Sequence, residues 1–113
     1  MAYYIKQYDT KTAMRATLKA QGNPVDLTNA IEVRFIMAQV NTIIINKTIN
    51  ITDAVNGKVW FPFEEVETSK TGSFKGEFVV IFDDSRVETF PNTGAIQIII
   101  SDSNLALTKT ITP

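Results

Sequence analysis

Apolar and polar side chains alternate with a period of two along much of the chain, which predicts β-strands. From residue 13 to residue 20 every second side chain is apolar, the pattern of a strand with one buried face. The same alternation runs over residues 31–38, where it places Ile31, Val33, Phe35 and Met37 on the inward face, and over residues 74–82, so both are expected to form long strands. Shorter extended segments are expected at residues 25–28, 43–45, 47–51, 59–63, 87–90 and 95–100.

Turn-forming residues separate these segments. Asn56-Gly57 is a strong hairpin signal, and residues 83–86 (Asp-Asp-Ser-Arg) are expected to close another hairpin. Pro62 lies inside a strand-like segment, and because proline cannot donate to a strand ladder, the strand should end or bend there. Residues 62–71 are the only stretch where a helical turn is expected, and we predict a loop or one short turn.

The number and spacing of these segments predict an all-β fold. About seven to nine short strands, separated by regular turns, are typical of an antiparallel sandwich or a barrel. Residues 105–113 are expected to form an edge strand or the start of a linker. The length of 113 residues favours one domain spanning residues 1–113. Six inward-facing aromatic side chains are expected to fill the space between two sheets: Phe35, Phe61, Phe63, Phe74, Phe78 and Phe82.

The amino-acid composition excludes several kinds of catalytic or metal site and several classes of partner. The chain lacks cysteine and histidine, which excludes disulfides, thiolate metal sites and the usual general base near neutral pH. Lys and Arg number 11 against 12 Asp and Glu, so the basic excess of a nucleic-acid-binding protein is missing. A net charge near zero opposes self-association only weakly. With no secretory signal and no apolar run long enough for a bilayer, we expect a soluble protein made in a cytoplasm, without nucleic-acid or membrane partners.

Seven short motifs, taken in their order along the chain, resemble those of a known protein family. They are residues 7–10 (QYDT), 16–18 (ATL), 22–28 (GNPVDLT), 33–37 (VRFIM), 57–61 (GKVWF), 71–78 (TGSFKGEF) and 88–92 (ETFPN). Their order and spacing resemble the N-terminal domain of the phage baseplate upper protein family, from about Ile5 to about Ser101. The resemblance implies an immunoglobulin-like domain that docks onto the central tail hub and carries or braces receptor-binding parts. It also implies a place in the virion, after synthesis in the host bacterial cytoplasm.

Trp60 is the first candidate for contact with a partner. The period of two places it on the outer face of its strand, between the inward-facing Val59 and Phe61. Tryptophan is enriched at the energetic centres of protein interfaces. The alternative is a tryptophan covered by the loop of residues 64–70.

A second candidate surface consists of four aliphatic residues that lie opposite the core positions of their strands: Ile36, Val79, Ile81 and Ile99. Apolar side chains on both faces of a strand indicate that the second face is covered as well. We expect another copy of the chain or another baseplate protein to cover it. An intramolecular loop or a local bulge is the alternative.

Two groups of carboxylates are candidates for chemistry. Asp83, Asp84 and Glu88 offer oxygen ligands for calcium, but they lack the alternating spacing of a dedicated calcium loop. The carboxylates of residues 64–67 lie together on one loop, whereas a glycosidase needs two carboxyl groups held across a cleft. A solvated face is the simpler interpretation. We expect no catalytic residue, no metal and no cofactor.

The sequence therefore predicts a non-catalytic structural component of a bacteriophage or prophage tail baseplate, with other tail proteins or a second copy as partners. The alternative is a carbohydrate-binding or host-adhesion module of the tail. An exposed row of aromatic side chains, formed by Trp60 with Tyr3, Tyr4 and Tyr8, would favour that alternative. Otherwise the tyrosines are expected to form an N-terminal edge strand or arm.

Overall fold

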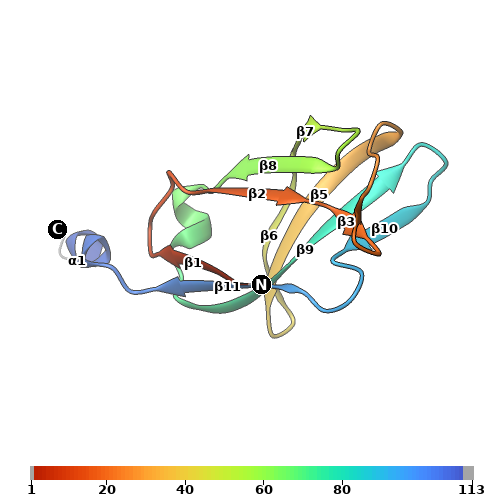
Figure 1. Cartoon of the computed structure of the whole chain (residues 1–113). Helices are drawn as coiled ribbons and strands as arrows, with labels where there is room; N and C mark the ends of the chain where they lie inside the picture. Colours follow the sequence, from red (N-terminus) through yellow and green to blue (C-terminus); the bar gives the residue numbers. More distant parts are fainter. Residues whose placement is uncertain (1, 111–113) are drawn as a thin grey trace.

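Two β-sheets packed face to face dominate the computed structural model, which describes residues 2–110 (Figure 1). The six-stranded sheet has the order β1 (Ala2–Lys6), β11 (Ile96–Ser101), β9 (Gly72–Phe82), β5 (Ala30–Gln39) and β6 (Thr42–Thr48), and β10 (Val87–Phe90) also pairs with β9. The three-stranded sheet has the order β2 (Ala13–Thr17), β8 (Lys58–Pro62) and β7 (Asn50–Asp53). The remaining elements are the hairpin of β3 (Lys19–Ala20) and β4 (Asn23–Pro24), the 3₁₀ turn η1 (Glu65–Thr68) and the helix α1 (Asn104–Thr110).

The predicted all-β sandwich is confirmed, while its immunoglobulin-like details stay a prediction. Residues 2–110 contain eleven strands rather than seven to nine, because β3 and β4 are paired strands of only two residues each. β1 pairs with β11 in parallel, whereas the other strand pairs of the two sheets are antiparallel. The short turn predicted within residues 62–71 is η1, and β8 ends at Pro62 as expected.

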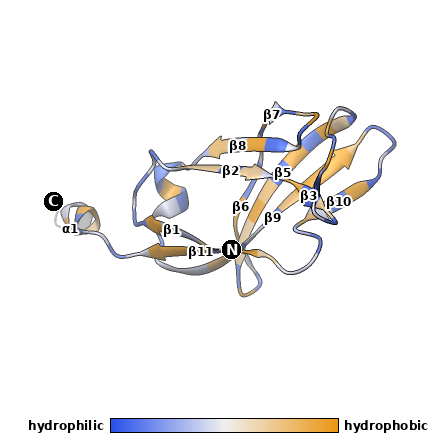
Figure 2. Cartoon of the chain, in the orientation of Figure 1, coloured by the Kyte–Doolittle hydropathy of each residue, from blue (hydrophilic) through white to orange (hydrophobic). Residues whose placement is uncertain are grey.

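The core between the sheets is built around aromatic rings. Phe35 of β5 meets Phe61 of β8 across the sandwich with ring centroids 4.5 Å apart, and Phe78 of β9 lies 5.2 Å from Phe35. Five of the six predicted inward aromatics are buried, but Phe82, the last residue of β9, is only partly buried. Phe90 of β10 also belongs to the buried core, although its four-residue strand is too short to show a clear alternation. Apolar residues concentrate on the strands, and polar residues occupy many of the loops (Figure 2).

A bulge at the start of β5 overturns one predicted core position. The alternation placed Ile31 in the core, but its side chain is 68% exposed. Ala30 pairs with Phe82 while Glu32 pairs with Ile81, so one extra residue lies on β5 between two consecutive partners on β9. The extra residue shifts the inward and outward positions locally. The next three inward positions of β5 are buried as predicted.

The strand that the alternation predicted over residues 13–20 is divided at Leu18, beside Gly57. The Leu18 N–H donates to the Gly57 carbonyl over 2.8 Å, and the strand divides there into β2 and β3. Gly57 has a φ of +68°, and a Cβ at this position would lie 2.6 Å from the Val25 carbonyl oxygen and 2.8 Å from that of Leu18. Only glycine lets the β7–β8 turn approach the β3–β4 hairpin so closely.

Residues 104–110 form the helix α1, so the edge strand predicted after residue 105 is wrong, while the alternative, the start of a linker, stays a prediction. Ser103 begins it: the Ala106 N–H lies 3.1 Å from the Ser103 carbonyl oxygen and 3.4 Å from its Oγ. Leucine, alanine and lysine, which favour helices, follow in this segment. The Ser103 Oγ also donates to the Gln7 carbonyl over 2.8 Å, which ties the start of α1 to the end of β1. Residue 1 and residues 111–113 of the predicted single domain lie outside the described residues.

Candidate docking surfaces

Three of the four aliphatic candidates lie together on the outer face of the six-stranded sheet. Ile36 of β5 is the register partner of Glu77 on β9, so its diagonal neighbour on the same face is Val79. Ile81 follows two residues later on the same face of β9. All three side chains are half-buried.

Ile99 is separated from this group. It lies on β11 opposite Ser73, near the start of β9, whereas Val79 and Ile81 lie near its end. Ile99 is half-buried, and its neighbour on β1 is Tyr4, which is 76% exposed. The predicted four-residue surface is therefore divided into two places.

Val87 extends the main group, although the short pattern of residues 87–90 did not single it out. It lies on β10 as the register partner of Ile81 and is 60% exposed. We call the set of Ile36, Val79, Ile81 and Val87 the aliphatic surface. The exposed Ile31 lies in the bulge next to Glu32, which pairs with Ile81 from the other side.

A polar network on β5 and β6 borders the aliphatic surface. Arg34, the register partner of Val79, places Nη1 2.9 Å from the Glu32 carboxylate and donates from Nε to Asn46 over 2.9 Å. The Thr48 hydroxyl donates to the same carboxylate. This hydrogen bond, together with the charge of Arg34, lowers the pKa of Glu32. The two charges at this border thus neutralise each other.

Trp60 lies on the outer face of the other sheet, as the alternation predicted. Its register partners are Arg15 on β2 and Asn50 on β7, and its side chain is half-buried. Beside it is an open hollow of about 500 Å³, which we call the Trp60 hollow. The hollow is lined by residues of β2, β7 and β8, namely Arg15, Ala16, Thr17, Thr52, Lys58, Val59 and Trp60. The loop of residues 64–70 contributes none of these lining residues.

The tyrosines do not gather around Trp60. Tyr3 and Tyr4 lie on β1, the edge strand of the six-stranded sheet, and Tyr8 follows in the turn after it. Tyr3 packs against the core and donates its hydroxyl to the Arg15 carbonyl over 3.0 Å. The predicted N-terminal edge strand is therefore confirmed, and the aromatic row expected of a glycan-binding platform is not formed.

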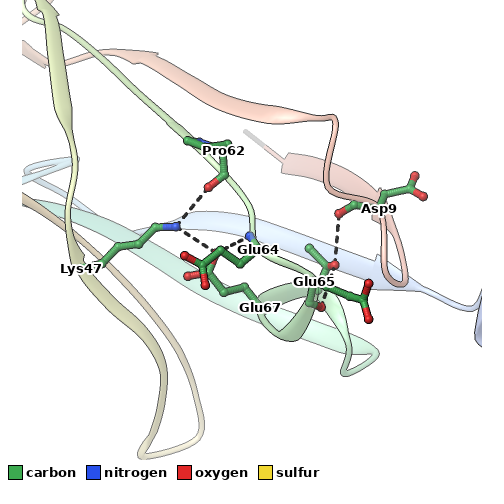
Figure 3. Close-up of polar contacts among 7 residues, drawn as sticks. Asp9, Lys47, Pro62, Glu64, Glu65 and Glu67 are labelled. Carbon is green, nitrogen blue, oxygen red and sulfur yellow. Dashed lines mark hydrogen bonds and ion pairs between the residues drawn. The ribbon is translucent and has the colours of Figure 1, made fainter. Parts of the chain in front are cut away.

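The carboxylates of residues 64–67 differ in their surroundings (Figure 3). Glu64 and Glu65 are exposed, as expected of a solvated face. Glu67 contradicts that interpretation, because its side chain is only 11% exposed and lies 2.9 Å from Lys47 Nζ. It also accepts a hydrogen bond from the Glu64 N–H over 2.7 Å. Lys47 further donates to the Pro62 carbonyl, so the cluster fastens η1 between β6 and β8.

Two of the three calcium candidates, Asp84 and Glu88, are engaged in turn contacts. Asp84 accepts a hydrogen bond from the Arg86 N–H over 3.0 Å, and its carboxylate lies 3.5 Å from the Arg86 side chain. Glu88 accepts from the Asn92 side chain over 3.1 Å. Within residues 2–110 there is no group of three or more potential metal ligands. In the same part of the chain, no helix is long and apolar enough to cross a membrane.

Comparison with known proteins places the chain in a family. No curated protein matches it. The solved N-terminal domain of phage TP901-1 ORF48 is similar with a TM-score of 0.68 and 14% sequence identity, over 89% of this chain and 85% of that chain, which shows a shared fold. The model of the BppU N-terminal domain matches residues 2–110. The chain therefore belongs to the BppU family of baseplate upper protein N-terminal domains, and it is a structural component of a bacteriophage tail baseplate.

Proposed function

We propose that this domain is a non-catalytic docking module that attaches to neighbouring tail proteins, the tail hub or receptor-binding parts, through the aliphatic surface. The family match over residues 2–110 supports a place in the baseplate, where the domain contacts other tail proteins. The observation that carries the choice of surface is the pairing of Ile81 with the 60% exposed Val87 on an outer sheet face.

The composition of this face suits an interface. The centres of protein interfaces are depleted in charge and surrounded by a polar rim. Here the aliphatic side chains lie beside Glu32 and Arg34, whose charges are already paired and hydrogen-bonded. A partner that covers Ile81 and Val87 would therefore not need to supply a counter-charge for Glu32 or Arg34, and the burial of apolar area would drive docking. Glu77, the register partner of Ile36, adds one further carboxylate to this face.

The titratable groups support a role without catalysis. Among the carboxyl groups of residues 2–110, those with a shifted pKa are Asp26 and Glu32, and both shifts are downward. The main cause in each case is a hydrogen bond from a neighbouring threonine, Thr28 or Thr48. Asp26 is exposed and Glu32 is half-buried at the sheet surface, and each accepts its hydrogen bonds from residues beside it, unlike a catalytic acid or base held in a cleft at a raised pKa.

The test measures complex formation with the other baseplate proteins of the same phage genome, by size-exclusion chromatography with light scattering. We expect Ile81→Asp and Val87→Asp to weaken the complex by about tenfold or more, because each places a charge in an apolar contact. Val40→Asp is the matched control, because Val40 is 89% exposed in the β5–β6 turn, away from the aliphatic surface.

Circular dichroism and thermal unfolding would establish that each variant is folded. The proposal fails if folded Val87→Asp binds as tightly as the wild type, or if Val40→Asp weakens the complex equally. A wild-type dimer that Ile81→Asp dissociates would assign the surface to a second copy instead of another tail protein.

A further inference from the structure

The Trp60 hollow lies on the opposite side of the sandwich from the aliphatic surface and differs from it in chemistry. Lys58 and Trp60 alternate with the buried Val59 on β8, so both project from the outer face. Arg15 and Thr17 are their register partners on β2. An indole ring, two cations and a hydroxyl thus surround one open hollow.

The cations of this hollow have no carboxylate partner. Arg15 and Lys58 are exposed, and none of the ion pairs among residues 2–110 includes either of them. The Lys58 Nζ donates to the Thr17 hydroxyl over 3.3 Å. Asp53 is the sole acidic residue of β2, β7 and β8, and its carboxylate accepts from the Asn56 side chain over 2.9 Å. Asp53 is also the register partner of Lys58, so this sheet carries two cations and one carboxylate, although the chain as a whole has a net charge of −1.

The edge of the sheet beside the hollow limits how a partner approaches. β2 is an edge strand, and such strands often pair with an added strand. The Tyr3 hydroxyl already occupies the Arg15 carbonyl on β2. Strand addition along β2 would have to break this hydrogen bond, whereas a partner that binds the side chains on the sheet face leaves it intact.

The chemistry of the hollow fits a protein segment better than a glycan. An arginine and a lysine bind carboxylates, and an indole ring packs against an apolar or aromatic side chain. One tryptophan provides a single stacking surface, since Tyr3 and Tyr4 lie on the other sheet and Tyr8 lies in the turn after β1. The baseplate family supplies protein neighbours.

We infer that the Trp60 hollow binds an acidic segment of another tail protein, with a carboxylate on Arg15 or Lys58 and an adjacent apolar side chain on the Trp60 indole. The inference concerns a different surface from the proposed function and holds whichever way the test of the aliphatic surface turns out. With both surfaces occupied, the domain holds two partners on opposite sides.

A model peptide tests the inference directly. Trp60 is the only tryptophan of the chain, so its emission reports on this hollow without background. The probe is a labelled decapeptide that alternates glutamate and leucine, and the reference peptide alternates glutamine and leucine. We expect saturable anisotropy with the acidic peptide, a simultaneous change in Trp60 emission, and weaker binding as salt rises from about 50 to about 300 mM.

Two charge reversals of equal size are compared, one inside the hollow and one on the other sheet as the control. Arg15→Glu should weaken acidic-peptide binding by about tenfold, the effect of losing one charge-assisted hydrogen bond. Lys75→Glu makes the same change in net charge on an exposed residue of the six-stranded sheet and should leave binding within about twofold of the wild type.

Four results would overturn the inference. The first is equal weakening by Arg15→Glu and Lys75→Glu, and the second is binding that leaves the Trp60 emission unchanged. The third is equal affinity for the two peptides. The fourth is tighter binding of polygalacturonate than of the acidic peptide, which would assign the hollow to an anionic glycan.

Discussion

Replacing Gly57 and Gly22 by alanine, one at a time, separates two costs: that of a positive φ for an L-residue and that of a Cβ in a closely packed place. Both residues have a positive φ, +68° for Gly57 and +81° for Gly22. A Cβ at Gly22 would meet nothing within 4 Å, whereas a Cβ at Gly57 would lie 2.6 Å and 2.8 Å from two carbonyl oxygens. Alanine at either position restricts the unfolded chain equally, so this contribution cancels in the comparison.

The expected costs differ severalfold. For Gly22→Ala we expect a loss of about 1 kcal/mol in the free energy of unfolding, the cost of left-handed backbone for an L-residue. Gly57→Ala carries the same cost and must also displace the carbonyls of Leu18 and Val25. The Leu18 carbonyl accepts the Val25 N–H over 2.9 Å, so the displacement strains a hydrogen bond that holds the β3–β4 hairpin. Together with overpacking, this raises the expected loss to about 3–5 kcal/mol.

Urea unfolding followed by far-ultraviolet circular dichroism measures both variants against the wild type. Thermal unfolding provides a second measurement. A loss of 1 kcal/mol lowers the melting temperature of a domain of this size by about 4–8 °C, so it should fall by roughly 5 °C for Gly22→Ala and by more than 12 °C for Gly57→Ala. Equal losses for the two variants would refute the close approach at Gly57. An unchanged slope of free energy against urea is the control for two-state unfolding.

Three further predictions concern contacts described above. Lys47→Met should cost about 2 kcal/mol in urea unfolding, because it leaves the mostly buried Glu67 carboxylate without its cation, and a loss below about 0.5 kcal/mol would contradict this. The pKa of Glu32 is lowered, so its contribution to stability is present above the ordinary value of 4.5 and is lost as pH falls through the folded-state pKa. Thr48→Val should raise this pKa in an NMR titration and flatten the loss of stability on acidification; an unchanged pKa would exclude the hydrogen bond as its cause. Phe35→Leu should cost about 2 kcal/mol in thermal unfolding by removing ring contacts across the sandwich, and a neutral variant would contradict that packing.

The alternation predicted the fold well wherever the strand pairing is regular. It placed Phe35, Phe61 and Phe78 in the core, where the structure has them. It failed at Ile31, because a bulge is a property of two paired strands and leaves no mark in the period of one. It also missed α1, whose seven residues are too few for a helical period to stand out.

The candidate surfaces were predictable one strand at a time, but not as assemblies. The outer position of Trp60 follows from its neighbours on β8 alone. That Arg15 stands beside it depends on the register of β2 against β8, which the pattern of neither strand determines. The same limit explains Ile99, whose strand meets the opposite end of β9 from Ile81.

The parallel pairing of β1 with β11 affects how the chain is completed during its synthesis. Ala2 pairs with Gln97 and Lys6 with Ser101, so β1, which is made before the other strands of this domain, finds its partner only when nearly all of the described residues have emerged. At a typical translation rate this takes roughly 5–20 s. During that interval the N-terminal strand has no place in the sheet, and its apolar residues Tyr3 and Ile5 are open to chaperones and to other nascent chains.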